Sequence, residues 1–361
     1  MKRILVSLSA ALALGACTAQ MRAPQTPNPV PPQARAADSL IRVGETHFSH
    51  LWQLTFGGEN AEAYWSGDGS KLIFQSTRDG YPCDQIYSMD LATGDVQRVS
   101  TGTGRTTCAY FYEGDQRILY ASTHLVSDSC PPPPDFSQGY VWPLSEGYDI
   151  FTAKTDGSDL LRLTGTPGYD AEATVSRDGQ WIVFTSVRDG DLELYRMRTD
   201  GSEATRLTEM EGYDGGAFFS PDDQWICWRA NYPTEEAELA DYRRLLAQGL
   251  IRPGALDLWV MRADGSDKRR VTELPGASFA PFYTPDGRSL IFSSNWENPE
   301  GRNFDLYLVS TEGGTAEPVT REETFDGFPM FSPDGRWLVF ASNRGARARG
   351  ETNVFLAEWK D

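Results

Sequence analysis

The feature that most constrains the fold is a segment that recurs six times along the chain. Its clearest copy is FSPDGRWLVFASNR, residues 331–344. Each copy contains a short apolar run that ends in an aromatic residue. A second short run follows, then a turn such as Asp200-Gly201, and then a run that ends in Leu-Thr or Val-Thr. The six aligned aromatic residues are Phe74, Tyr120, Phe184, Trp228, Phe292 and Phe340.

The spacing of the copies predicts an all-β fold. Most copies begin ~40–50 residues apart, and four short strands in a unit of that length are typical of a propeller blade. The run 337–340 is rich in strand-forming residues and too short for a helix. Because so small a sheet cannot cover both of its faces, the blades must stack around an axis. We therefore predict a six-bladed β-propeller of four-stranded antiparallel blades.

The repeated unit also resembles that of a known family. The unit contains, in order, F-S-P-D-G, an apolar run, D-L-Y, D-G-S and R-L-T. This pattern resembles the WD40-like, or PD40, repeat of TolB-like six-bladed propellers. The resemblance covers about residues 48–361. It implies the same fold but says little about function, because propellers carry many functions.

The run HLWQLT, residues 50–55, is expected to close the ring. The last repeat has room for strands near 328–332, 336–342 and 353–359, and it lacks a fourth. The N-terminal run ends in Leu-Thr, as the outer strands of the other repeats do. We predict that this strand completes the last blade and so removes an open sheet edge.

Two segments are expected to precede the propeller, which spans 46–361. Residues 1–17 combine Lys2 and Arg3 with an apolar run too short to cross a bilayer, as in a secretory signal. The sequence LGAC resembles the bacterial lipobox, which implies that Cys17 is acylated; an ordinary secretory signal is the alternative. Residues 18–45 are rich in proline and are predicted to form an extended tether. Thr18 favours attachment at the periplasmic side of the outer membrane, so we expect a lipid-anchored protein of the cell envelope.

Two insertions interrupt the repeat. The first, 124–148, combines prolines with aromatic residues. The second, 230–256, is predicted to contain a short helix over 234–248 in blade 4, with Thr234 as its N-cap and Gly249 ending it. Both fall between the second and third strands of their blades. They should therefore lie on one face of the propeller.

The cysteines suggest a disulfide. Cys83, Cys108 and Cys130 are expected at the same end of the molecule, outside the cytoplasm, where a disulfide persists. One pair should bridge, but the sequence does not say which, and three free thiols remain the alternative. Cys227 is expected to be buried.

Charge and motif content restrict the functions. The net charge is −18, so nucleic acid is not an expected partner. His124 is the one histidine within the six repeats, which argues against a zinc site. No metal or other cofactor is expected, although calcium held by carboxylates stays an alternative. The sequence has no hydrolase, zinc-protease or nucleotide-binding motif, and a monomer is expected.

Aligned positions of the repeats point to a candidate site. Asp recurs at 170, 214 and 326 and Arg recurs at 78, 188 and 344, which also fits a structural ion pair between blades. His124, Glu62 and Glu172 depart from the repeat. We predict a site at the channel mouth on the face that bears the insertions, with Tyr140 and Trp142 as a lid. The predicted ligand-binding residues are His124, Tyr140, Trp142, Asp170, Glu172, Arg188, Asp214, Asp326 and Arg344.

Two function classes remain. The favoured one is a lipid-anchored envelope propeller that binds a protein, peptide or glycan at that mouth. The alternative is a propeller enzyme, such as a polysaccharide lyase or a hydrolase. It would use Glu62, Glu172 or Asp170 as base, Arg188 or Arg344 to bind an anionic group, and His124 as acid.

Overall fold

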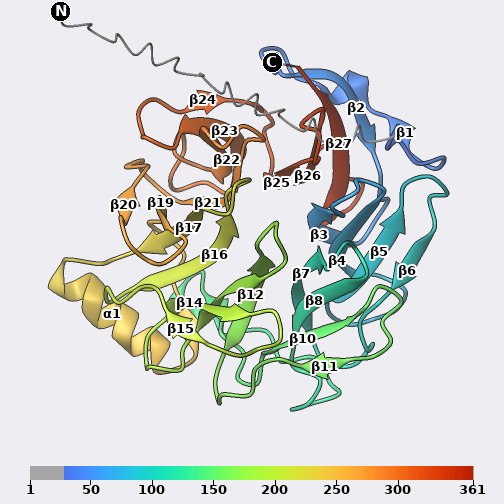
Figure 1. Cartoon of the computed structure of the whole chain (residues 1–361). Helices are drawn as coiled ribbons and strands as arrows, with labels where there is room; N and C mark the ends of the chain where they lie inside the picture. Colours follow the sequence, from blue (N-terminus) through green and yellow to red (C-terminus); the bar gives the residue numbers. More distant parts are fainter. Residues whose placement is uncertain (1–27, 361) are drawn as a thin grey trace, which may run out of the picture.

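Six antiparallel sheets surround a central axis (Figure 1), as a computed structural model of the chain shows for residues 28–360. The predicted all-β, six-bladed fold is confirmed. Blades 1 to 5 each have four strands, which follow one another from the axis outwards. Blade 1 consists of β3 (Glu59–Trp65), β4 (Lys71–Thr77), β5 (Gln85–Asp90) and β6 (Val96–Arg98). Blade 2 consists of β7 (Thr106–Tyr112), β8 (Arg117–Ser122), β10 (Asp149–Lys154) and β11 (Leu161–Arg162).

The next three blades repeat this arrangement. Blade 3 consists of β12 (Asp170–Val175), β13 (Trp181–Ser186), β14 (Glu193–Arg198) and β15 (Thr205–Arg206). Blade 4 consists of β16 (Tyr213–Phe219), β17 (Trp225–Asn231), β19 (Asp257–Arg262) and β20 (Arg269–Arg270). Blade 5 consists of β21 (Ser278–Tyr283), β22 (Ser289–Ser294), β23 (Asp305–Ser310) and β24 (Glu317–Pro318).

Blade 6 joins the two ends of the propeller, as predicted. It contains β25 (Asp326–Phe331), β26 (Trp337–Ser342), β27 (Asn353–Trp359) and the N-terminal β2 (Phe48–Gln53). Figure 1 shows β2 beside β27. The two strands pair antiparallel, with Leu51 opposite Ala357, and both side chains are fully buried. The ring is therefore closed by hydrogen bonds between the N-terminal and C-terminal strands.

Strand structure attached to the propeller is present before the predicted boundary at residue 46. A short strand, β1 (Arg35–Ala36), pairs with β2, and a 3-10 turn, η1 (Asp38–Leu40), follows it. The Asp38 carboxylate accepts a hydrogen bond of 2.8 Å from the backbone N–H of Leu51. The last part of the predicted tether thus packs on blade 6. Residues 1–27, which include the predicted signal and Cys17, lie outside the described residues.

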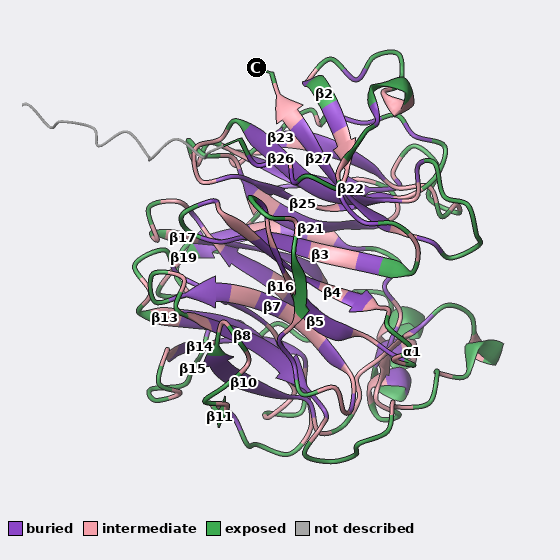
Figure 2. Cartoon of the chain, turned by 90° about the vertical axis from the view of Figure 1, so that its right-hand side faces the viewer, coloured by how far each residue is buried: buried purple, intermediate pink, exposed green. Residues whose placement is uncertain are grey.

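The core lies between the blades. Figure 2 shows buried residues running along the strands, with exposed residues concentrated in the loops. All six aligned aromatic side chains of the repeats are at most 1% exposed. Each blade packs one of these aromatic side chains against the adjacent blade. The repeated sequence unit therefore makes the same kind of packing contact in every blade. No helix among residues 28–360 is long and apolar enough to cross a membrane.

The two insertions join over one face. Strand β9 (Trp142–Pro143) of the first pairs antiparallel with β18 (Leu250–Ile251) of the second. Arg252 of the second donates to the backbone carbonyl of Gln138 in the first, which lies in the turn η2 (Phe136–Gln138). We name this joined structure, residues 136–144 and 249–256, the lid. The sequence predicted the shared face but not the pairing.

The predicted helix is shorter than expected. Helix α1 spans Glu236–Leu246, and its N-cap is Glu235 rather than the predicted Thr234, with no side-chain capping hydrogen bond. The chain leaves the helix before Gly249, whose φ of 67° lies in the left-handed region that glycine adopts without strain.

The disulfide joins Cys83 to Cys130 and so ties the first insertion to blade 1. The sequence alone leaves this pairing open. Cys108 is free and half-buried, and Cys227 is free and buried, as predicted for Cys227.

Candidate functional site

Every innermost strand contains a β-bulge at the same position of the repeat. The strand register shifts there in all six blades. The bulge residue has a left-handed backbone, with φ between 49° and 59°, which is uncommon for residues other than glycine. These side chains line one central cavity. The six bulge residues are Glu62, Cys108, Glu172, Gly216, Ala280 and Phe328.

The cavity has a volume of about 970 Å³ and lies on the face that bears the insertions. The lid covers part of it, through Tyr140, Trp142 and Ile251. Residues two further along the same strands, among them Tyr64, Thr174 and Phe218, also line it. There the ring of Phe218 lies 5.5 Å from that of Tyr64. The cavity is thus bounded by side chains from all six blades.

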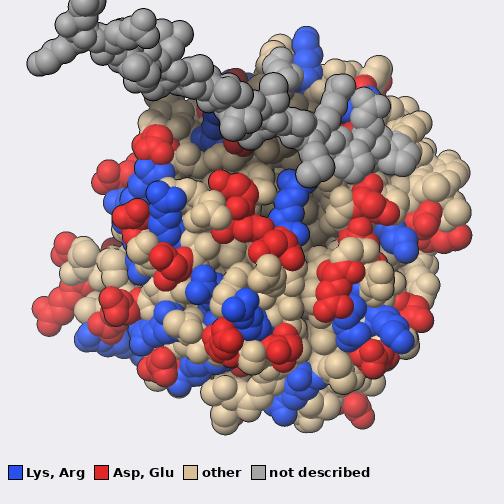
Figure 3. Space-filling view, in the orientation of Figure 1, with Lys and Arg blue, Asp and Glu red and all other residues tan. Residues whose placement is uncertain are grey.

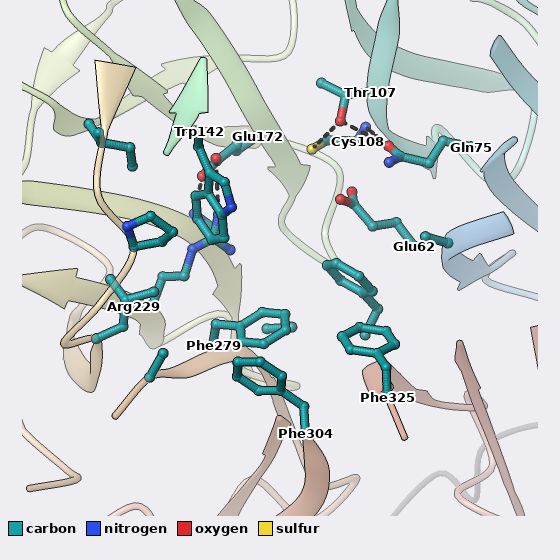
Figure 4. Close-up of a pocket in the computed structure, with 18 of the residues that line it drawn as sticks. Glu62, Gln75, Thr107, Cys108, Trp142, Glu172, Arg229, Phe279, Phe304 and Phe325 are labelled. Atoms are coloured by element: carbon teal, nitrogen blue, oxygen red, sulfur yellow. Dashed lines mark hydrogen bonds and ion pairs between the residues drawn. The ribbon is translucent and has the colours of Figure 1, made fainter. Parts of the chain in front are cut away.

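One polar wall is organised around Glu172 (Figure 4). Its carboxylate accepts hydrogen bonds from the backbone N–H of Gly216 at 2.6 Å and from Arg229 Nη2 at 3.0 Å. The hydroxyls of Tyr169 and Tyr213 also donate to it. Burial opposes the charge of Arg229, but Glu172 and Tyr213 raise its pKa above the usual value. The Glu172–Arg229 ion pair in this wall therefore has its hydrogen-bond partners within the protein itself.

Glycine at position 216 makes room for that ion pair. A Cβ added there would lie 2.1 Å from Arg229 Nη1, far inside contact distance. The guanidinium consequently occupies the place that a side chain from blade 4 would otherwise take in the ring of bulge residues.

Glu62 has a different environment from Glu172. Its Oε2 atom is buried and has no hydrogen-bond partner among the described residues. Burial raises the pKa of Glu62 to about 7, although the nearby Cys108 thiol and Arg229 act in the opposite direction. Burial, with Glu62 and Glu172, also raises the pKa of Cys108 well above its usual value. The thiol is therefore protonated at neutral pH and is a poor nucleophile.

The opposite wall is apolar. Phe279 lies 5.1 Å from Phe304 and 5.6 Å from Phe328, measured between ring centroids. Phe325 lies 6.1 Å from both Phe304 and Phe328. Figure 4 shows Phe279, Phe304 and Phe325 on the side of the cavity away from Cys108 and Gln75. We name Phe279, Phe304, Phe325 and Phe328 the phenylalanine wall.

Three of the nine predicted ligand-binding residues line the cavity: Tyr140, Trp142 and Glu172. Trp142 packs edge-on to Tyr213 and lies 5.4 Å from the Arg229 guanidinium. Tyr140 stacks on Phe136, and its hydroxyl accepts a hydrogen bond from Trp142 Nε1. Trp142 thus packs against the Glu172–Arg229 wall, whereas Tyr140 packs within the lid.

Four of the other six form ion pairs inside their own blades. Arg188 lies 3.1 Å from Asp170 in blade 3, and Arg344 lies 2.6 Å from Asp326 in blade 6. Arg344 also lies 3.1 Å from Glu45, and neither side chain of that pair is exposed. The ion pair inferred from the repeat is present, but the prediction that it joins neighbouring blades is wrong. It joins the first strand of a blade to the loop after its second strand.

Asp214 and His124 are likewise held within their blades. The Asp214 carboxyl accepts hydrogen bonds from Trp228 Nε1 and the Tyr232 hydroxyl, and burial raises its pKa to about 8. His124 takes the place that arginine has in other blades. Its Nδ1 lies 2.8 Å from Ser122 Oγ, and its ring lies 4.4 Å from that of Phe151. Burial lowers the pKa of His124.

The residues predicted for an enzymatic site do not all line the cavity. Glu62 and Glu172 line it, but Asp170, His124 and Arg344 are not among its lining residues, and neither is Arg188. Among residues 28–360, no group of three or more His, Cys, Asp or Glu side chains is placed to hold a metal ion. The expectation of no metal or other cofactor, with calcium as its alternative, stays a prediction.

Sequence reasoning missed Arg229 and the phenylalanine wall. A weak signal was available for the wall, because an aromatic residue recurs immediately before the innermost strand in blades 3 and 6, as Tyr169 and Phe325. Arg229 had no such signal, since its role depends on the missing side chain at Gly216.

Parts of the chain match known proteins. Residues 257–355 match the PD40 family model, the TolB beta propeller domain. The Tol-Pal system protein TolB of Bordetella pertussis is 31% identical over 132 residues, which is 37% of this chain and 25% of that protein. TolB of Nitratidesulfovibrio vulgaris is 43% identical over 37 residues, or 10% of this chain and 8% of that protein. The chain thus matches at most a quarter of the length of these relatives.

Several solved structures share the fold. Putative TolB from Agrobacterium tumefaciens has a TM-score of 0.54 at 19% identity and covers 84% of this chain and 91% of its own. A gluconolactonase from Xanthomonas campestris has a TM-score of 0.56 at 14% identity, with 92% and 97% covered. An oligogalacturonate lyase with manganese has a TM-score of 0.51 at 16% identity, with 92% and 97% covered. At these identities the likeness extends to the fold alone.

Proposed function

From the TolB-like six-bladed propeller that this chain carries, we propose that the protein binds a segment of another cell-envelope protein in its central cavity. One observation carries the proposal: the cavity of about 970 Å³ is covered by a lid built from two separate insertions, and it has one polar and one aromatic wall. Cavities of this size and mixed lining are typical of binding sites.

The chemistry of the walls favours a protein segment over a glycan. A sugar carries a hydroxyl on nearly every carbon, and hydroxyls buried without partners cost free energy. The phenylalanine wall offers no such partners, and the Glu172 carboxylate already accepts hydrogen bonds from Gly216 and Arg229. A peptide instead combines apolar side chains with a few polar groups. The relatives' name, Tol-Pal system protein, supports a protein partner in the envelope.

One carboxyl group that lines the cavity supports the enzymatic alternative. Glu62 has a pKa raised by burial to about 7, which suits a general base near neutral pH. The enclosed, mixed-charge cavity would also suit catalysis. No predicted acid or anion-binding residue lines the cavity beside it, however, because His124, Arg188 and Arg344 are bound within their blades. Binding therefore accounts for the cavity better than catalysis does.

A photo-crosslinking experiment tests the proposal. We expect a benzoylphenylalanine at Phe304, in the phenylalanine wall, to form an adduct with an envelope protein on irradiation of intact cells. The same residue at Arg288, in an exposed turn between the first two strands of blade 5 and so at the opposite face, is the control. No adduct at Phe304, or the same adduct from both positions, would contradict binding in the cavity.

We also propose that Cys17 carries the lipid anchor, on the strength of the LGAC sequence after an apolar run. A Cys17→Ser variant is expected to move from the detergent phase to the aqueous phase on detergent partitioning. An unchanged detergent-phase fraction in the variant would exclude a lipid on Cys17. A Cys227→Ser variant, which changes a buried core thiol, should stay in the detergent phase.

A further inference from the structure

We propose that the cavity recognises an alkylammonium group, with Glu62 as its carboxylate partner and the phenylalanine wall holding the apolar part of the ligand. The inference rests on the proposed function and names the chemistry that the site selects. In a protein ligand an alkylammonium group has two sources, a lysine side chain or the amino terminus of the chain, and both present the same chemistry to Glu62.

The charges that line the cavity do not balance. Three guanidinium groups line it, and two have carboxylate neighbours: Arg229 lies 3.0 Å from Glu172, and Arg105 lies 3.9 Å from Asp84. The third, Arg302, stacks on the lid residue Tyr140 at 4.6 Å. Five carboxylates line the cavity: Glu59, Glu62, Asp84, Glu172 and Glu300. The excess of carboxylates favours a cationic ligand over an anionic one.

Glu62 is the carboxylate that most needs a partner. Glu59 and Glu300 are exposed to solvent, whereas Glu62 Oε2 is buried and has no hydrogen-bond partner among the described residues. A buried acceptor without a partner carries a desolvation penalty, which a ligand donor removes. An ammonium group brings three donors and no acceptor, so it can satisfy this oxygen without adding an unpaired acceptor.

The position of Glu62 in the bulge directs its carboxyl into the cavity. Its φ of 52° breaks the strand alternation that would otherwise bury the side chain within blade 1. The remaining walls leave room for an apolar group beside the ammonium, because the rings of the phenylalanine wall line the same cavity. A ligand that joins both features, such as an amine next to an aromatic side chain, matches both walls.

The surroundings of Glu62 set the pH dependence of this recognition. The titratable and charged groups facing Glu62 are Tyr64 on β3, Cys108 on β7, Tyr148 before β10, Glu172 on β12, Arg229 on β17 and Asp84 in the loop before β5. Burial raises the pKa of Glu62 to about 7, so the free carboxyl is largely protonated at pH 6 and largely ionised at pH 8. Only the ionised form pairs with an ammonium. Affinity should therefore rise from pH 6 to pH 8.

Titration calorimetry on the full chain tests the proposal with two probes of the same shape and opposite charge. The probes are 2-phenylethylammonium and 3-phenylpropanoate. At pH 8 we expect the ammonium to bind on the order of tenfold to a hundredfold more tightly, as for a buried charge-assisted hydrogen bond. Glu62→Gln should abolish the preference. Glu300→Gln removes the same charge from the exposed rim of the cavity and should preserve it.

Two further arms make the result decisive. Phe-Gly-Gly-amide and acetyl-Gly-Phe-Lys-Gly-amide place the amine at the chain terminus and on lysine. Their relative affinities identify the source once they are corrected for the fraction of each amine that is protonated at the pH used, since an α-amino group has a pKa of about 8 and lysine one of about 10. The rise in affinity from pH 6 to pH 8 needs no variant and would be seen in the unaltered chain. Three outcomes would overturn the proposal: equal binding of the two phenyl probes, a preference that survives Glu62→Gln, or a flat pH profile of affinity. Those results would leave the Phe304 crosslink unaffected, so failure of this inference is distinguishable from failure of the proposed function.

Discussion

Deleting residues 46–56 is expected to unfold the propeller under conditions in which the intact chain is stable. The deletion removes β2, which supplies the strand outside β27 in blade 6. It also removes Phe48 and Leu51, which are 7% and 0% exposed. Loss of each large buried side chain costs ~2–5 kcal/mol, so the total is comparable to the stability of a whole domain, ~5–15 kcal/mol. Thermal unfolding followed by circular dichroism measures the effect.

A matched deletion separates ring closure from a general effect of shortening the chain. Residues 132–135 belong to the first insertion, lie outside the lid, are mostly exposed, and leave the Cys83–Cys130 disulfide intact. Their removal should change the melting temperature little. If the 46–56 deletion melted at the same temperature as the intact chain, closure by β2 would not stabilise the propeller.

Arg344→Met is expected to lower the free energy of unfolding by ~3–5 kcal/mol, the usual cost of removing one partner of a buried ion pair. The guanidinium lies 2.6 Å from Asp326 and 3.1 Å from Glu45, and its side chain is fully buried. The substitution leaves two carboxylates in the core without a counter-charge. Urea denaturation of the variant and of the unaltered chain gives the difference.

Arg188→Met is the natural comparison. Arg188 makes the equivalent pair with Asp170, but its side chain is 17% exposed and it has no second carboxylate. We therefore expect a smaller loss of stability than for Arg344→Met. An Arg344→Met variant within ~1 kcal/mol of the unaltered chain would contradict a structural role and would return Arg344 to the set of ligand-binding candidates.

The sequence predicted the fold well because one sequence unit recurs along the chain at a roughly regular spacing. Six copies of one unit determine the blade count, and the Leu-Thr ending of residues 50–55 identifies the strand that closes the ring. The pairing of the two insertions was not predictable, since β9 and β18 are only two residues each and lie more than a hundred residues apart. The choice of Cys83 and Cys130 from three cysteines likewise depended on the course of the insertion.

The sequence predicted only part of the cavity lining, and the bulges explain why. In a regular strand, residues two apart face the same side, so Asp170 and Glu172 were expected to share the channel mouth. The left-handed backbone at Glu172, with φ of 57°, sends its side chain into the cavity, while Asp170 is 1% exposed inside its blade. The sequence contains no sign of a left-handed residue at Glu62 or Glu172, because glycine occupies the position in blade 4 alone.

Charged side chains on the surface also pair with nearby side chains of opposite charge. Acidic and basic side chains are interspersed on the face in Figure 3, and many arginines there and elsewhere pair with nearby carboxylates. Arg162 with Asp149 and Arg206 with Glu193 are examples in which an outer strand is tied to its neighbour. Several repeated charges in this chain therefore form ion pairs within single blades.

One measurement tests most directly whether ligand binds in the cavity or at the repeated ion pairs. 4-Fluorophenylalanine is placed at Phe304, in the phenylalanine wall, or at Phe184, which is fully buried with Arg188 over its ring at 5.0 Å. Fluorine NMR spectra of the full chain are then recorded during titration with 2-phenylethylammonium at pH 8. We predict that the Phe304 resonance shifts with saturation while the Phe184 resonance stays in place. A shift at Phe184 with no change at Phe304 would place binding at the Asp170–Arg188 pair and contradict the cavity as the site.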